Sequence, residues 1–134
     1  MRAISLWQPW ASAIALGVKH VETRHWPTDY RGPLAIHAAK RWTREQKEFA
    51  QVEVSLGRMA KRIPLGAIVA TARLVDCRPT EELKLTVSAI ERLYGNYEPG
   101  RYGWILAGIV ALPEPIAYRG AQGFFSVPDE LLPT

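Results

Sequence analysis

Three charged side chains stand close together in the segment GVKHVETRHW, residues 17–26: Lys19, Glu22 and Arg24. Side chains alternate between the two faces of a β-strand, so a strand that begins at residue 20 places Glu22 and Arg24 on one face and Thr23 on the other. Lys19 lies in the turn just before and is free to lean toward either face. The pattern therefore brings a carboxylate next to two cations.

Such a group has the parts of a hydrolytic site. Glu22 is a candidate general base, acting on a water or, if the strand twists, on Thr23. Lys19 or Arg24 would stabilise the negative charge that develops on a carbonyl oxygen. Lys19 is also a candidate base or nucleophile if desolvation and Arg24 lower its pKa. The alternative is an ordinary surface face on which Glu22 and Arg24 are solvated or paired.

Two tryptophans bracket a glutamine and a proline in the preceding segment, SLWQPW, at residues 5–10. Trp7 and Trp10 would form a stacking wall for a flat ring, with Gln8 donating to and accepting from the edge of a base and Pro9 between them. Packing in the core is the alternative for at least one of the two indoles. The segment predicts a binding site for a planar heterocycle.

Further candidates come from two apolar segments, LAIHAAK and YGWIL. His37 is either a hydrogen-bonded core residue or a cleft residue, and Lys40 follows it by three positions. Trp104 either adds an aromatic ring to the cleft or anchors its strand. No second histidine stands at a useful spacing from His37, so we expect no metal site.

Composition limits the class of protein. The chain has 134 residues, 48% hydrophobic and 22% charged, which predicts one globular domain with its own core. A formal net charge of +4 permits a polyanionic partner such as RNA without requiring one. We find no apolar run long enough to span a membrane, and the single Cys77 fits a reducing compartment, so we expect a cytoplasmic protein.

Periodicity and turn signals predict several strands of uneven length interrupted by short helices. Thr43 and Gln46 form a capping box at the start of one helix. Thr80, Glu81 and Glu82 are expected in a polar loop. The arrangement favours a closed or nearly closed sheet with helices over its openings. We expect strands at 3–7, 20–24, 31–40, 66–77, 100–112 and 120–127, and helices at 8–17, 43–57 and 86–95.

In order and over nearly its whole length, the chain resembles the ASCH domain family. The resemblance is carried by SLWQPWASAIALGVKHVETRHWP, RGPLAIHAAK, GAIVATARLVDC, YGWIL and FFSVPDELL. The family signature G-x-K-x-x-E-x-R falls on Gly17, Lys19, Glu22 and Arg24. The resemblance implies a single ASCH domain over 1–134 with an α+β, PUA-like fold: a small β-barrel with short flanking helices and a cleft lined by the signature lysine.

Members of this family are described as RNA-binding modules or as small amidohydrolases that remove acyl groups from N4-acylated cytidine. The amidohydrolases use a lysine, a threonine and a glutamate and need no metal or other cofactor. Their lysine falls on Lys19, but their threonine falls on Glu22, so the chain departs from the pattern there. Their glutamate falls in the loop after the long central strand, on Glu81 or Glu82.

The resemblance favours an amidohydrolase that acts on a modified cytosine nucleoside held beside Lys19. One alternative is an RNA-binding module in which Trp7 stacks on a base while Lys19, Arg24, Lys40 and Arg41 contact phosphate. Binding of that kind would weaken strongly with salt. The other alternative is an interaction module whose cleft is inert. We expect a monomer or a dimer with no membrane partner.

Overall fold

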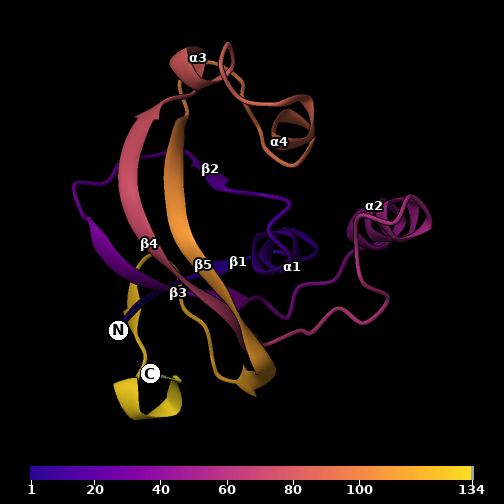
Figure 1. The fold of residues 1–134 in the computed structure, drawn as a ribbon, viewed down its shortest axis with the longest axis vertical. Helices are drawn as coiled ribbons and strands as arrows, with labels where there is room; N and C mark the ends of the chain where they lie inside the picture. Colours follow the sequence, from indigo (N-terminus) through magenta and orange to yellow (C-terminus); the bar gives the residue numbers. More distant parts are fainter. Residues whose placement is uncertain (134) are drawn as a thin grey trace.

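A mixed sheet of six strands forms the centre of the computed structural model, which describes residues 1–133 (Figure 1). The strand order is β2-β5-β4-β3-β1-β6, with β1 and β3 parallel and all other pairs antiparallel. The two edges, β2 and β6, do not pair, so the sheet is barrel-like but not closed. The strands are β1 (Arg2–Leu6), β2 (Val21–Arg24), β3 (Gly32–Ala38), β4 (Ala67–Pro79), β5 (Tyr102–Ala117) and β6 (Phe125–Ser126).

Short helices lie around this sheet. The capping box at Thr43 and Gln46 is confirmed: it begins the longest helix, α2, and each of its two side chains accepts the other residue's backbone N–H. The six-stranded sheet and its short helices together confirm the α+β class and the PUA-like architecture expected from the sequence. The helices are α1 (Trp10–Ala15), α2 (Arg44–Ser55), α3 (Thr80–Leu83) and α4 (Ala89–Leu93), with a 3-10 turn η1 (Asp129–Leu131).

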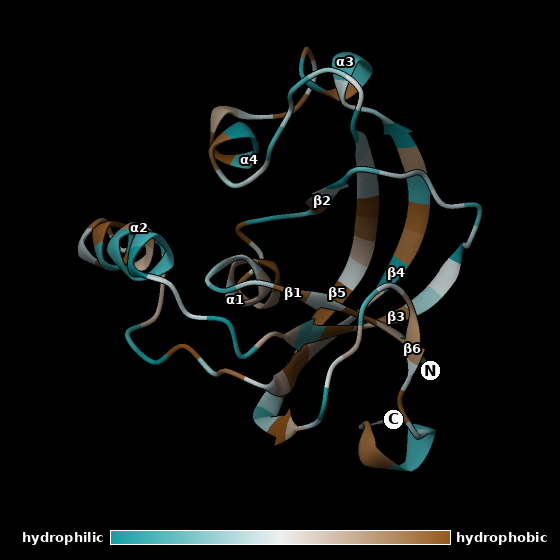
Figure 2. Cartoon of the chain, turned by 180° about the vertical axis from the view of Figure 1, so that it is seen from behind, coloured by the Kyte–Doolittle hydropathy of each residue, from teal (hydrophilic) through white to brown (hydrophobic). Residues whose placement is uncertain are grey.

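The largest part of the core lies between the sheet and α1. Its members are mostly aliphatic residues of β1, β3, β4 and β5, with Trp104 as the one large buried indole. Figure 2 shows hydrophobic segments on these central strands. Burial of these side chains supplies most of the driving force for folding, at about 25 cal/mol per Å² of apolar surface.

Three element predictions need correction. The segment with Glu81 and Glu82 is not a loop, because it forms the one-turn helix α3 directly after β4. The strand expected at 100–112 extends to Ala117 because it pairs with β4 along its length. The last strand is reduced to Phe125–Ser126, the two residues of this segment that pair with β1.

The contact of β2 with β5 leaves no room for a side chain at Gly103. A Cβ atom there would collide with Leu83 of α3 and with Val21 of β2. Gly103 pairs with Thr23, so this close approach helps to fix the strand that carries the charged motif.

We therefore predict that Gly103→Ala lowers the free energy of unfolding by about 1–3 kcal/mol, the usual cost of overpacking. Urea denaturation measures the change. Val110→Thr, at an exposed position of the same strand, is the control and should alter stability by less than about 0.5 kcal/mol. Equal stability of Gly103→Ala and wild type would contradict the packing described here.

Candidate functional site

A cavity of about 860 Å³ opens where β1 leads into α1. Its walls come from the end of β1, the start of α1, the strand β2 with the two residues after it, the end of α4, and the loop 121–123. Glu22, Thr23 and Arg24 all contribute to the wall. The lining residues are Ser5, Leu6, Trp7, Trp10, Glu22, Thr23, Arg24, His25, Trp26, Leu93, Tyr94, Gly95, Asn96, Arg101, Ala121, Gln122 and Gly123.

Lys19 lies directly behind this wall and is only 1% exposed. Its Nζ donates a hydrogen bond to the carbonyl oxygen of Tyr94, at 2.8 Å, and lies 3.8 Å from Oε1 of Glu22. Desolvation lowers the pKa of Lys19, and the charges of Glu22 and Glu91 oppose that shift. The Lys19 side chain therefore points toward Glu22 and is buried at the start of β2.

Glu22 and Arg24 share a face of β2, as the alternation predicted. Arg24 Nη1 donates to Glu22 Oε2 at 3.0 Å, and both side chains are about seven-eighths buried. The Arg24 guanidinium also lies over two indoles, 5.3 Å from the ring centroid of Trp104 and 5.6 Å from that of Trp26. Cation–π contact and the ion pair together fix the plane of the guanidinium.

Thr23 points away from Glu22 and Arg24, toward the loop that follows α4. Its hydroxyl oxygen accepts the backbone N–H of Asn96 at 2.9 Å, and its carbonyl oxygen accepts from Arg101. Thr23 still forms part of the cavity wall. Its hydroxyl is therefore held by a backbone group, and none of the hydrogen bonds found among residues 1–133 joins it to Glu22.

Two indoles stand exposed at the rim. Trp7 is 53% and Trp26 49% exposed. The Arg41 guanidinium lies 4.3 Å from the ring centroid of Trp7. Trp10, by contrast, stacks on Phe49 of α2, so of the two tryptophans predicted from SLWQPW one faces solvent and the other packs.

Gln8 does not face the cavity, and its predicted contact with a base edge does not fit the geometry. The residue is fully buried. Its amide nitrogen donates to Ser12 Oγ at 2.7 Å and to the Pro64 carbonyl at 2.8 Å, and its amide oxygen accepts the Ser12 N–H. Pro9 precedes α1 at its N-cap position and is not part of the cavity wall either.

Three further predicted residues lie away from the cavity wall. His37 is buried between Ser5 Oγ and the Tyr118 carbonyl, which its ring nitrogens contact at 2.9 and 2.7 Å, and desolvation lowers its pKa. It is the hydrogen-bonded core histidine of the two alternatives. Lys40 packs along Gly66. Trp104 lies beneath Arg24 and donates through Nε1 to the Trp26 carbonyl, so it supports the site from below.

Neither Glu81 nor Glu82 approaches Lys19. Both are exposed on α3, where Glu82 pairs with Arg78 at 3.6 Å and Glu81 accepts from the Gly100 N–H. The helical carboxylate whose negative charge raises the pKa of Lys19 is instead that of Glu91 in α4, which is buried. Its Oε1 accepts the His20 backbone N–H. The sequence offered no signal for Glu91 beyond its charge.

A second buried network holds Tyr94, the residue whose carbonyl receives Lys19. The Tyr94 hydroxyl donates to Glu53 Oε1 of α2 at 2.6 Å, and Arg58 donates to both oxygens of Glu53 at 2.8 and 3.0 Å. The Arg58 and Tyr94 hydrogen bonds lower the pKa of Glu53, and burial raises that of Tyr94. The helix α2 is thereby tied to the cavity wall.

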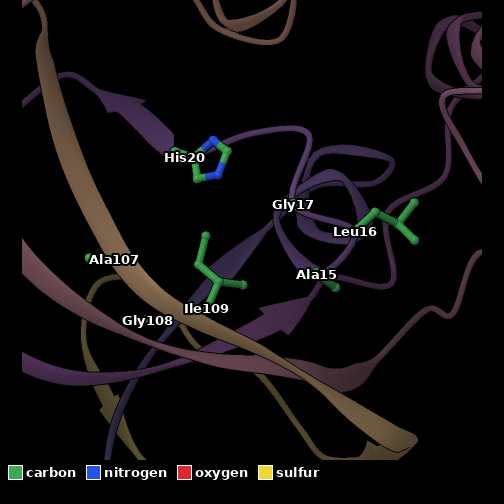
Figure 3. A pocket seen from close by; sticks show the side chains of 7 residues that line it. All are labelled: Ala15, Leu16, Gly17, His20, Ala107, Gly108 and Ile109. Atoms are coloured by element: carbon green, nitrogen blue, oxygen red, sulfur yellow. The ribbon is translucent and has the colours of Figure 1, made fainter.

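A smaller cavity of about 360 Å³ shares no lining residue with the larger one. Figure 3 shows it between the end of α1, with Leu16 and Gly17, and the β5 segment around Ile109, with the His20 imidazole at its edge. No group of three or more histidine, cysteine, aspartate or glutamate side chains within residues 1–133 is arranged to hold a metal ion. Among the described helices, none is both long and apolar enough to cross a membrane.

The model of the ASCH domain family matches residues 4–113, and the chain belongs to this family. It is similar to Activating signal cointegrator 1 of Homo sapiens, with 33% identity over 87 residues that cover 60% of this chain and 15% of the human protein. The Mus musculus protein of the same name is 35% identical over 80 residues, 55% of this chain and 14% of that protein. The chain thus spans a small part of these relatives.

Solved structures show the same fold. The crystal structure of ASCH from Zymomonas mobilis superimposes with a TM-score of 0.58 at 19% identity, covering 96% of this chain and 88% of that one. A serine-to-alanine mutant of the same Zymomonas protein gives 0.57 at 20% identity, covering 96% and 89%. At this identity the likeness establishes the architecture alone.

The depressed pKa of Lys19 predicts a pH dependence of stability. As pH rises, the folded protein releases the Lys19 proton before the unfolded chain, whose lysine titrates near 10.5. Between the folded value and 10.5 the unfolded state binds more protons, so the free energy of unfolding rises with pH. Lys19→Met should lack this rise.

Urea denaturation of wild type and Lys19→Met across this interval measures the difference between the two proteins, in which the titrations of all other groups largely cancel. Lys47→Met, at an exposed position of α2, is the control and should follow wild type. Parallel curves for wild type and Lys19→Met would contradict the burial of the ammonium.

Proposed function

We propose that the larger cavity binds a nucleobase, as part of a nucleotide or of an RNA strand. The observation that carries this proposal is the pair of exposed indoles, Trp7 and Trp26, at the rim of a cavity whose walls also hold Arg24 and Arg101. An indole is a large apolar ring that is costly to expose to water, and it stacks well on any base. Arginines beside them suit the phosphates of the same ligand.

The size and polarity of the cavity agree with such a ligand. A volume of about 860 Å³ lies within the usual range for small-molecule sites and exceeds what a single base requires. Asn96 and Gln122 line the wall with side-chain amides. The Asn96 oxygen accepts the Glu98 backbone N–H, so its NH2 group is a donor for a base, and the Gln122 amide can donate and accept. Polar groups of this kind read the edge of a stacked base.

Replacing the rim indoles tests the proposal. We predict that Trp7→Ala and Trp26→Ala each weaken binding of a short cytidine-containing RNA by about 5- to 150-fold, because stacking on one base contributes about 1–3 kcal/mol. Isothermal titration calorimetry measures the affinity. Leu85→Ala, at an exposed position outside the cavity, is the control. Unchanged affinity in both tryptophan variants would contradict a stacking site.

A second candidate function is hydrolysis of the N4-acyl amide of a cytosine nucleoside. The observation that favours it is the buried Lys19 with its lowered pKa, 3.8 Å from a carboxylate that lines the cavity. Buried ionisable groups beside a cleft are characteristic of catalytic sites. In this reaction Glu22 would accept the proton of the attacking water and pass it to the N4 nitrogen as the C–N bond breaks. Arg24 would stabilise the oxyanion, and Lys19 would act through its contact with Glu22.

Hydrolysis of N4-acetylcytidine, followed by ultraviolet absorbance with chelator present, tests this candidate. We predict turnover by wild type and its loss, by at least about a hundredfold, in Lys19→Ala and Glu22→Gln, since Glu22 is the base and Lys19 is the buried cation beside it. Lys47→Ala is the control for loss of a lysine charge. Absence of turnover by wild type would exclude this activity for the substrate, and full turnover by Lys19→Ala would exclude the mechanism.

A further inference from the structure

We propose that Arg24 receives a phosphate monoester inside the cavity, so that the ligand is a nucleoside monophosphate or the phosphorylated end of an RNA strand. This inference rests on the proposed binding of a nucleobase and specifies the chemical class of its ligand. The phosphate would contact the buried Arg24 of the cavity wall, unlike the backbone phosphates of a strand that crosses the cavity opening.

Arg24 has few protein partners for its hydrogen-bond donors. A guanidinium carries several N–H donors in a planar fork. Only one acceptor among the described residues, Glu22 Oε2, lies within hydrogen-bond distance of Arg24. The side chain is 14% exposed and lines the cavity. Its remaining donors can therefore be satisfied only from the cavity, by solvent or by a ligand.

The neighbouring cations do not offer the same opportunity. Arg101 is more committed, because each of its three nitrogens already has a protein partner: the carbonyls of Thr23 and Asn96 and the His25 ring. Lys19 donates to Tyr94 behind the wall and does not line the cavity. Of the two arginines that line the cavity, Arg24 has fewer protein acceptors, and Trp104 supports its plane. Such a fork matches the geometry of a phosphate.

The charge and depth of the position point the same way. The cavity wall carries two arginines, Arg24 and Arg101, and one carboxylate, Glu22, which lies between Arg24 and the buried Lys19. An excess of positive charge in a partly desolvated wall favours an anion. The Arg24 side chain lines the cavity and is 14% exposed, whereas Arg41 is exposed and lies on Trp7. A terminal phosphate or a free nucleotide reaches such a buried guanidinium with less obstruction than an internal phosphate, which brings a nucleotide on each side.

Isothermal titration calorimetry with cytidine, 5′-CMP, 3′-CMP and inorganic phosphate tests the inference. We expect wild type to bind one of the two monophosphates at least about tenfold more tightly than cytidine, as charge-assisted hydrogen bonds imply. Arg24→Gln should abolish this preference, and Arg24→Lys, which keeps the charge but not the fork, should retain part of it. Arg73→Gln removes an exposed arginine of β4 and serves as the control.

A short RNA with and without the corresponding terminal phosphate then separates the two sources of the monoester. Tighter binding of the phosphorylated RNA would identify a strand end, and preference for the free monophosphate over both RNAs would identify a nucleotide. Equal affinity of wild type for cytidine and both monophosphates would overturn this inference and leave the nucleobase proposal intact. Absence of binding to any of these ligands would overturn both. The comparison within wild type decides the question even if Arg24→Gln does not fold.

Discussion

The burial of one ammonium group organises this molecule around its cavity. Lys19 is removed from water at the start of β2, where its Nζ depends on the Tyr94 carbonyl and on the Glu22 carboxylate. A buried charge without partners costs several kcal/mol, so the fold must keep both partners within reach. That requirement holds β2 against the end of α4, and the Glu53 hydrogen bond to Tyr94 extends the constraint to α2.

This arrangement leaves different amounts of freedom to the charged groups of the wall. Arg101 is committed to protein acceptors and closes the loop after α4 onto β2. Arg24 is oriented by Glu22 and by the indole of Trp104 but keeps donors for a ligand. The exposed indoles of the rim add stacking surface. Arg101 is thus held by protein groups, whereas Arg24 is oriented by the protein and faces the cavity. A side chain that is fixed before its ligand arrives is expected of a preorganised binding site.

Local rules of sequence predicted the local features. Period-two alternation placed Glu22 with Arg24, and the capping box marked the start of α2. The direction of an individual polar side chain depends on neighbours that are distant in sequence, and here prediction failed. Gln8 bonds to the Pro64 carbonyl, 56 positions away, instead of facing the cavity. Glu91 influences the pKa of Lys19 because its carboxylate binds the His20 backbone N–H, 71 positions away, which no local pattern encodes.

Binding of a nucleobase in the larger cavity is the property on which the proposed function depends. Its most direct test is an NMR titration of the labelled protein with 5′-CMP, in which the indole N–H signals of all five tryptophans are followed separately. The account predicts that the signals of Trp7 and Trp26 shift with one common affinity while that of Trp42, outside the cavity wall, stays in place. Shifts confined to Trp42, or to signals of residues around the smaller cavity, would contradict it.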